Sequence, residues 1–241
     1  MFNFNTDLAD ERRDIYKKAN NIENEIPGIE MQEEIIDNNI KLSRVNITNE
    51  DGVKAIGKPI GTYISIDVKK LKIAEATEIQ KASEVVTGEL KKLIEKHITA
   101  SEDLLVVGLG NTYVTPDSLG PKVVKEIDIT RHLLKYAPEY IDPNTRPVTA
   151  IAPGVLGNTG IETLEIIKGI VDHVKPKLVI VIDSLASRSI ERISSTIQIA
   201  DTGIVPGGGV GNARSEISKA TLNIPVIAIR STNGGRPTAL L

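Results

Sequence analysis

Two aspartates stand where the chain could carry out chemistry. Asp117 lies in the glycine-rich segment 108–121, directly after the apolar run 104–107. Asp183 follows a second short run of apolar, mostly β-branched residues, 178–182. Runs of this kind predict buried strands. Reacting groups in open parallel sheets lie beyond the carboxyl ends of the strands, so we expect the two carboxyl groups to meet there.

A pair of converging carboxyl groups has an acid–base consequence. Two like charges about 4 Å apart repel by about 4 kcal/mol at an effective dielectric constant of about 20, which equals roughly three pKa units. One acid would therefore keep a proton while the other is ionised. A hydrolase that activates water needs such an acid and such a base.

Each aspartate also fits a structural role when it is taken alone. Asp117 follows Pro116 and could be a turn or cap residue of a helix that begins near Ser118. Asp183 could be the N-cap of a helix that follows the strand. The pair, and not either residue by itself, favours catalysis.

Other patterns favour simpler interpretations. The triplet Asp201-Thr202-Gly203 has the form found in pepsin-like aspartic proteases, but those enzymes are β-rich and bring two copies together. We therefore interpret Asp201 as a turn residue. The glycine loops lack both the dinucleotide-binding spacing and the Gly-Lys-Ser/Thr ending of a phosphate loop, which disfavours nucleotide binding.

The histidines do not predict a metal site. His97, His132 and His173 share no short metal-ligand spacing, and two of them fall near the ends of predicted helices. Surface or capping roles are therefore favoured. A metal held by the two aspartates and one distant histidine remains an alternative, because folding can unite remote ligands.

Composition indicates an ordinary globular protein. The chain has 241 residues, 40% of them hydrophobic but only 3% aromatic, so Ile, Val, Leu and Ala must build the core. The formal net charge of -3 disfavours nucleic acid as a direct partner. The absence of cysteine excludes disulfides and thiolate chemistry. No apolar run has the length of a membrane span, and the N-terminus lacks a secretory signal, so we predict a cytoplasmic protein without a membrane partner.

The first hundred residues and the rest follow different patterns. Residues 10–24 predict a weakly amphipathic surface helix, and 73–98 predict a long helix. Residues 42–47 and 63–68 alternate between apolar and polar types, which predicts paired strands with one solvated face. These strands would form a small N-terminal β-hairpin addition.

After residue 103, short apolar runs alternate with turns and amphipathic segments. The runs are 104–107, 148–152, 178–182, 195–199 and 224–229, and residues 163–174 are the clearest crossover helix. This alternation predicts an α/β fold with a mostly parallel sheet covered by helices. Residues 230–238 are rich in breakers and show no periodicity.

Many separate blocks of the chain resemble, in the same order, the germination proteases of endospore-forming bacteria. These blocks are 6–9, 108–121, 130–133, 152–157, 159–163, 182–186, 196–212 and 225–229. The resemblance implies a three-layer α/β/α fold of the phosphorylase/hydrolase type and atypical aspartic endopeptidase activity without a cofactor. It also implies a homotetramer whose substrates are small acid-soluble spore proteins, degraded in the spore core during germination.

The resemblance also assigns roles to residues. The family's two aspartates fall on Asp117 and Asp183, and Gly108, Gly110 and Asn111 fall in the active-site loop. Family members are made as zymogens that cut their own N-terminus between an acidic residue and an apolar residue followed by Ala. The segment 6–9 has this pattern, so we expect cleavage between Asp7 and Leu8.

We therefore expect residues 1–7 to be a propeptide, 8–229 a single peptidase domain incomplete at its C-terminus, and 230–241 an irregular tail. Family members continue after the strand matching 225–229 into a Gly-Val-Pro-Thr turn and a further region. We expect this chain to be truncated or frame-shifted after Ile229. Gly208, where the family usually has Ser, is a minor departure.

Two alternatives to the aspartic endopeptidase remain. The first is a metal-dependent endopeptidase similar to the hydrogenase-maturation endopeptidases, because those enzymes share the implied fold. The second is a catalytically inactive, truncated chain that only binds spore proteins.

Overall fold

The computed structural model describes residues 4, 6–69, 71–185, 192–206 and 214–232. Its named strands form one sheet. The strands are β1 (Ile29–Asp37), β2 (Ile40–Ile47), β3 (Gly61–Val68), β4 (Leu104–Gly108), β5 (Val148–Ile151), β6 (Leu178–Leu185), β7 (Thr196–Ala200) and β8 (Val226–Thr232). Their order in the sheet is β1-β2-β3-β7-β8-β6-β4-β5.

The sheet has a parallel half and an antiparallel half. β5, β4, β6 and β8 pair in parallel, whereas β8 with β7, β7 with β3, β3 with β2, and β2 with β1 pair antiparallel. The predicted α/β class is confirmed, but the sheet is parallel in only one half. For β1 and β2 the reason is connection length, because residues 38–39 alone join them and a parallel crossover needs about a dozen residues or more.

The N-terminal strands continue the main sheet and are not a separate hairpin addition. β3 pairs with β7 from Tyr63–Ala200 to Asp67–Thr196, and β1 extends the far edge. The predicted solvated face is wrong, because polar side chains of β2 and β3 bond to covering helices. Arg44 Nε donates to Glu89 Oε2 at 3.0 Å, and the buried Ser65 hydroxyl donates to Asp10 Oδ1 at 3.4 Å on the other face.

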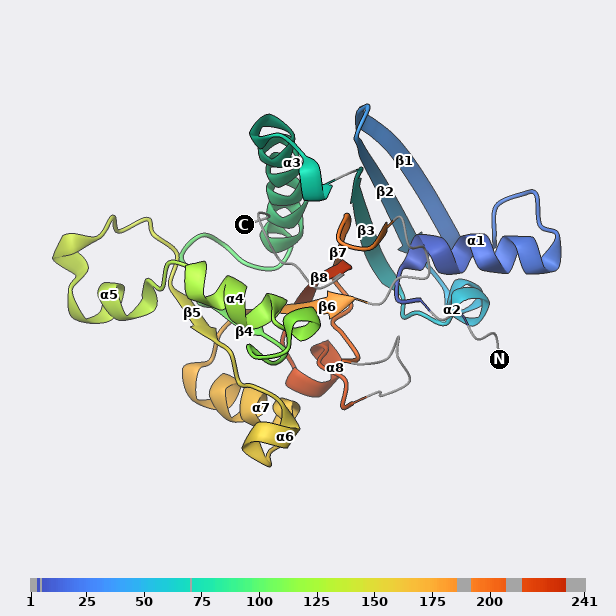
Figure 1. Ribbon diagram of the computed structural model, residues 1–241. Coiled ribbons are helices and arrows are strands. Elements are labelled where there is room, and N and C mark those ends of the chain that lie inside the picture. Colours follow the sequence, from blue (N-terminus) through green and yellow to red (C-terminus); the bar gives the residue numbers. More distant parts are fainter. Residues whose placement is uncertain (1–3, 5, 70, 186–191, 207–213, 233–241) are drawn as a thin grey trace.

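Helices cover both faces of the sheet, as a three-layer arrangement requires (Figure 1). α3 (Ala76–Glu95) and α4 (Leu119–Glu126) pack on one face through Leu93 and Val123. α7 (Thr163–Val174) and α8 (Lys219–Leu222) pack on the other through Ile167 and Leu222. α1 (Ala9–Asn20) and α2 (Glu50–Ile56) cover the N-terminal strands on that same face.

The remaining helical elements are short. They are α5 (Arg131–Tyr136), α6 (Leu156–Thr159) and the 3-10 turns η1 (Leu71–Ile73), η2 (Thr115–Asp117) and η3 (Pro138–Tyr140). α7 has the predicted bounds, whereas the predicted helix 73–98 is shorter, because the chain breaks between η1 and α3. Of the helices described, none combines the length and the apolar character needed to cross a bilayer.

A buried ion cluster fixes α1 to the sheet. Arg192 donates from Nε and Nη2 to the two carboxyl oxygens of Asp67 in β3, each at 2.9 Å. The same Nη2 donates to Asp10 Oδ2 in α1 at 2.8 Å, and the Thr196 hydroxyl also donates to Asp67. One guanidinium therefore holds the first helix, β3 and the start of β7 together.

Replacing Arg192 with Met should destabilise the protein by about 3 kcal/mol, because Asp10 and Asp67 would lose the counter-ion that they share in a mostly buried place. Chemical denaturation at neutral pH measures this change. Lys91→Met is the control: its ion pair with Glu95 is exposed and 3.8 Å long, so its loss should have no measurable effect. Equal effects from the two variants would show that the cluster does not hold the fold.

Candidate active site

A tight glycine loop holds Asp117. The residue ends η2, directly before α4. The backbone N–H of Asn111 donates both to the Asp117 carbonyl and to its Oδ2, each at 2.9 Å. Gly110 has a φ of +113°, and a Cβ there would lie 1.9 Å from the Asp117 carbonyl oxygen. Only glycine fits this close approach.

Gly108 permits a second close approach on the same loop. A Cβ at Gly108 would lie 2.1 Å from the carbonyl oxygen of Gly120, in the first turn of α4. The missing side chains therefore let η2 and α4 sit against the end of β4. The three predicted loop residues, Gly108, Gly110 and Asn111, lie where they position Asp117.

Asp183 lies inside a strand. β6 continues to Leu185, and Asp183 is directly opposite Arg230 of β8. A role as a helix N-cap is therefore wrong. Asp183 is only 7% exposed.

The structure brings the two aspartates to the same end of the sheet. The Ser184 hydroxyl, next to Asp183, donates to the carbonyl of Pro116, next to Asp117, at 2.8 Å. Burial raises the pKa of Asp183 to about 6; the positive charge of Arg230 opposes this shift, and the negative charge of Asp117 adds to it. Burial also raises the pKa of Asp117, against the hydrogen bond from Asn111. Two acids with raised pKa values therefore share one region.

The predicted cleavage site lies beside this region. Arg230 Nη2 donates to Asp7 Oδ2 at 2.8 Å, and the two side chains are only 9% and 7% exposed. Leu8 is fully buried. Arg230 thus faces Asp183 on one side and binds Asp7 on the other, and the negative charge of Asp7 also raises the pKa of Asp183.

Sequence reasoning missed Arg230, which it placed in an irregular tail. β8 instead continues to Thr232, so Arg230, Ser231 and Thr232 belong to the strand. The alternation of Val226, Ala228 and Arg230 on one face is the signal that could have found it. The breaker-rich residues that follow conceal this alternation.

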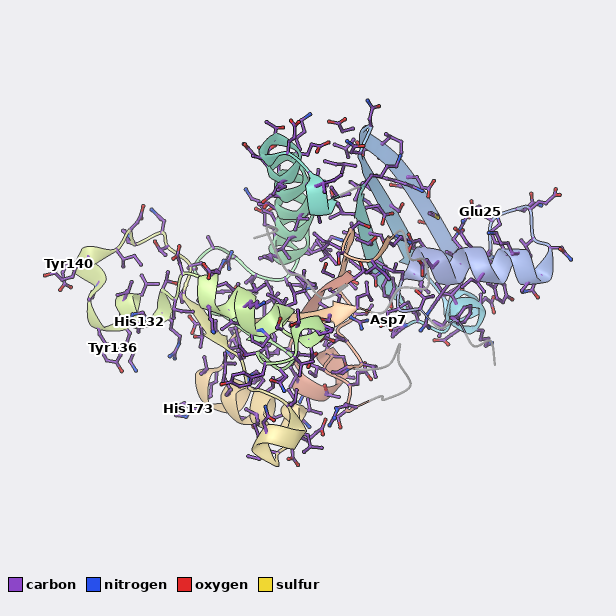
Figure 2. The ribbon with its side chains drawn as sticks, viewed as in Figure 1. Asp7, Glu25, His132, Tyr136, Tyr140 and His173 are labelled. Atoms are coloured by element: carbon purple, nitrogen blue, oxygen red, sulfur yellow. The ribbon has the colours of Figure 1, made fainter. Side chains whose placement is uncertain are left out.

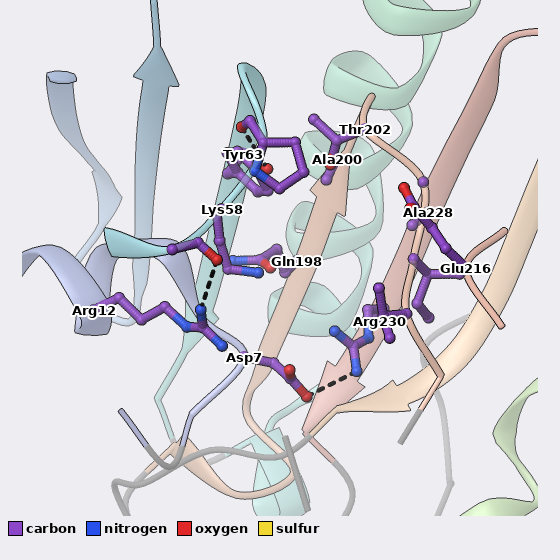
Figure 3. Close-up of a pocket in the computed structure, with 15 residues that line it drawn as sticks. Asp7, Arg12, Lys58, Tyr63, Gln198, Ala200, Thr202, Glu216, Ala228 and Arg230 are labelled. Atoms are coloured by element: carbon purple, nitrogen blue, oxygen red, sulfur yellow. Dashed lines mark hydrogen bonds and ion pairs between the residues drawn. The ribbon is translucent and has the colours of Figure 1, made fainter. Parts of the chain in front are cut away.

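A cavity of about 150 Å³ opens next to the Asp7–Arg230 pair (Figure 3). It is lined by residues from the N-terminal segment, α1, the β2–β3 connection, the sheet and the β7–α8 connection, among them Asp7, Arg12, Lys58, Tyr63, Gln198, Glu216 and Arg230. Lys58 Nζ lies 5.1 Å from the centroid of the Tyr63 ring. Burial, together with the positive charges of Arg12 and Arg230, lowers the pKa of Lys58 to about 7.

The other candidates from the sequence lie elsewhere. Asp201 is a turn residue, as predicted, and its Oδ1 accepts from the backbone N–H of Thr62 at 2.8 Å. Figure 2 shows His132 and His173 far from Asp7, on the opposite side of the view. Within the described ranges, no three His, Cys, Asp or Glu side chains gather as a metal site would require. Gly208 lies outside the described residues.

The raised pKa of Asp183 makes a stability prediction. Between about pH 4 and pH 6 the folded chain holds a proton on Asp183 that the unfolded chain has released, so the contribution of this residue to stability falls as pH rises. Asp183→Asn removes this titration. The stability of the variant relative to the wild type should therefore increase by about 2 kcal/mol from about pH 4.5 to about pH 7.5.

Denaturation curves of both proteins across this pH range test the prediction. The exposed Asp172→Asn, in α7, is the control and should show a constant difference from the wild type. A pH-independent difference for Asp183→Asn would mean that the carboxyl group of Asp183 has an ordinary pKa.

Comparison with known proteins adds an independent finding. A sequence model described as germination protease matches residues 6–238. The germination protease of Clostridium perfringens is 51% identical over 229 residues, which cover 95% of this chain and 69% of that protein. The one from Clostridium acetobutylicum is 48% identical over 231 residues, with 95% and 69% covered. The one from a Geobacillus species is 48% identical over 235 residues, with 95% and 63% covered.

The match extends on both sides of the site. It begins before Asp7 and continues past Ile229, so it includes most of the segment 230–241, which we expect to depart from the family. It therefore covers Asp117 and Asp183 as well as the predicted cleavage site. From a match over nearly its whole length, the chain belongs to the germination protease family.

Proposed function

We propose that the chain is an atypical aspartic endopeptidase that uses Asp117 and Asp183 to cut small acid-soluble spore proteins when a spore germinates. The observation that carries this proposal is the presence of two aspartates with raised pKa values at the same end of the sheet, where the Ser184 hydroxyl donates to the Pro116 carbonyl. Membership of the germination protease family supports the substrate class and the location in the spore core. A homotetramer is part of the proposal.

The different environments of the two acids suggest their roles. Asp183 is buried more deeply than Asp117 and its pKa is raised to about 6, so we assign it the role of the acid. Asp117 lies on a loop and is the base: its carboxylate takes a proton from water as the water oxygen attacks the scissile carbonyl carbon. Asp183 gives its proton to the leaving amide nitrogen as the C–N bond breaks. The proton on Asp117 then returns to Asp183.

The zymogen is the second part of the proposal, with residues 1–7 as the propeptide and Asp7–Leu8 as the bond that is cut. The Asp7 side chain contacts Arg230, which faces Asp183, so this bond lies close to the proposed dyad. Both residues are buried, which means that the bond is not open to other proteases in this arrangement. Residues 8–229 would then form the peptidase domain.

Asp117→Asn and Asp183→Asn should each abolish self-cleavage and the digestion of spore proteins, because each removes one partner of the proton transfer. Mass spectrometry of the purified full chain, before and after incubation under activating conditions, detects the loss of residues 1–7. Asp172→Asn is the matched control, since it makes the same change on the exposed face of α7, and it should cleave normally. Loss of residues 1–7 from Asp183→Asn would rule out the dyad.

The same assay separates the two alternatives. Activity that disappears on exhaustive chelation and returns with added metal would favour the metal-dependent endopeptidase. Wild-type chain that binds spore proteins but leaves them intact would favour the inactive binding protein.

Gly110→Ala should lower kcat by at least about tenfold and should also destabilise the protein, because the added Cβ overlaps the Asp117 carbonyl at a strained φ and must displace the loop that holds the carboxyl group. Peptide hydrolysis and thermal unfolding are measured together. Gly169→Ala in α7, where nothing lies within 4 Å of the new Cβ, is the control. Normal kcat in Gly110→Ala would show that the loop does not position Asp117 for catalysis.

A further inference from the structure

The cavity beside Asp7 contains more positive than negative charge. Three cations line it, Arg12, Lys58 and Arg230, whereas its acidic lining residues are Asp7 and Glu216. Cations that are taken out of water need counter-ions, because an unpaired buried charge is costly. The cavity therefore favours an anionic occupant in addition to the carboxylates already present.

Two hydrogen-bond donors at this cavity are unused. Arg230 is nine-tenths buried, and its Nε has no hydrogen-bond partner among the residues that the structure describes. Lys58 Nζ has the Tyr63 ring as its contact and makes no ion pair with any described residue. A native protein seldom buries a donor without a partner, so an unmatched donor at a cavity points to a ligand.

Arg12 is fixed as a wall of the same cavity. Its guanidinium donates to backbone carbonyl oxygens on two sides, those of Thr6, Ile56 and Gly57. The positive charge of Arg12 lowers the pKa of Lys58, and the negative charge of Asp7 acts to raise the pKa of Arg12. The cationic wall is therefore held in place by the protein before any ligand arrives.

Asp7 shows which kind of group this cavity takes. Its carboxylate binds Arg230, and both residues line the cavity (Figure 3). Asp7 is also the residue directly before the proposed cut. We propose that Arg12, Lys58 and Arg230 form the subsite that receives the acidic side chain preceding the scissile bond, and that Asp7 occupies this subsite in the uncut chain. After the cut, the acidic side chain of a substrate would take its place.

This proposal rests on the proposed function and adds the residues that set its specificity. A carboxylate accepts from several donors at once and neutralises the cations, whereas the neutral side-chain amide of Asn or Gln leaves the positive charge uncompensated. Discrimination between an acid and its amide should therefore reach at least about tenfold, the ratio expected when one charged hydrogen bond is lost.

The first experiment tests carboxylate binding without catalysis. Asp7→Ala in the full chain removes the resident carboxylate, and sodium acetate replaces the lost group. Acetate should raise the Tm of Asp7→Ala above that in sodium chloride of equal ionic strength, and it should not do so for the wild type. Adding Lys58→Gln should remove the effect of acetate, whereas Lys54→Gln, an exposed lysine in α2, should preserve it.

If Asp7→Ala does not fold, Asp7→Asn replaces it, because Asn keeps the shape of the Asp side chain. Arg230 then has no carboxylate partner at position 7. Changing Arg230 to Gln as well removes this unpaired charge, so the Tm of the double variant should be higher than that of Asp7→Asn. The subsite is contradicted if acetate acts no better than chloride on Asp7→Ala. It is also contradicted if Asp7→Asn is not stabilised by Arg230→Gln.

The second experiment measures specificity. Peptides that differ only in Asp or Asn before the scissile bond are compared by kcat/KM. The wild type should prefer Asp at least about tenfold, and Lys58→Gln and Arg12→Gln should reduce this preference by lowering kcat/KM on the Asp peptide. An unchanged preference in both variants would overturn the proposal. If the wild type cuts neither peptide, the proposed function fails, and the acetate experiment alone decides on the subsite.

Discussion

The burial of Asp183 is the constraint around which this end of the molecule is built. A carboxyl group inside a sheet of apolar strands has lost its water, which raises its pKa to about 6. The groups that favour its ionised form are few, chiefly Arg230 and the backbone N–H of Ser184. The glycine loop that carries Asp117 and the segment that carries Asp7 both lie near this buried carboxyl group, and the charges of both aspartates raise its pKa.

Much of the candidate site could be predicted from the sequence because it depends on local patterns. The runs before Asp117 and Asp183 identify two neighbouring parallel strands, and parallel strands end at the same edge of a sheet. The position of the two acids at one edge follows from this rule. The bounds of α7, Thr163–Val174, follow from its amphipathic period and from Lys175-Pro176.

The rest depends on pairing between distant segments, which local patterns do not encode. β7 has the composition of the other core strands, yet it runs antiparallel between β3 and β8. Arg44 and Ser65 have the polar alternation of a solvated face, but helices cover them and accept their hydrogen bonds. The role of Arg230 also depends on distant segments, because it lies opposite Asp183 of β6 and binds Asp7.

The clamp formed by Arg192 has a consequence for the proposed maturation. Arg192 binds Asp10, just after the bond that would be cut, and it also binds Asp67 of β3. The first helix would therefore stay in place when the preceding residues depart, and Arg12 would stay with it, held by the carbonyl oxygens of Ile56 and Gly57. Maturation would then empty a preformed cavity and increase its excess of positive charge without rebuilding its walls.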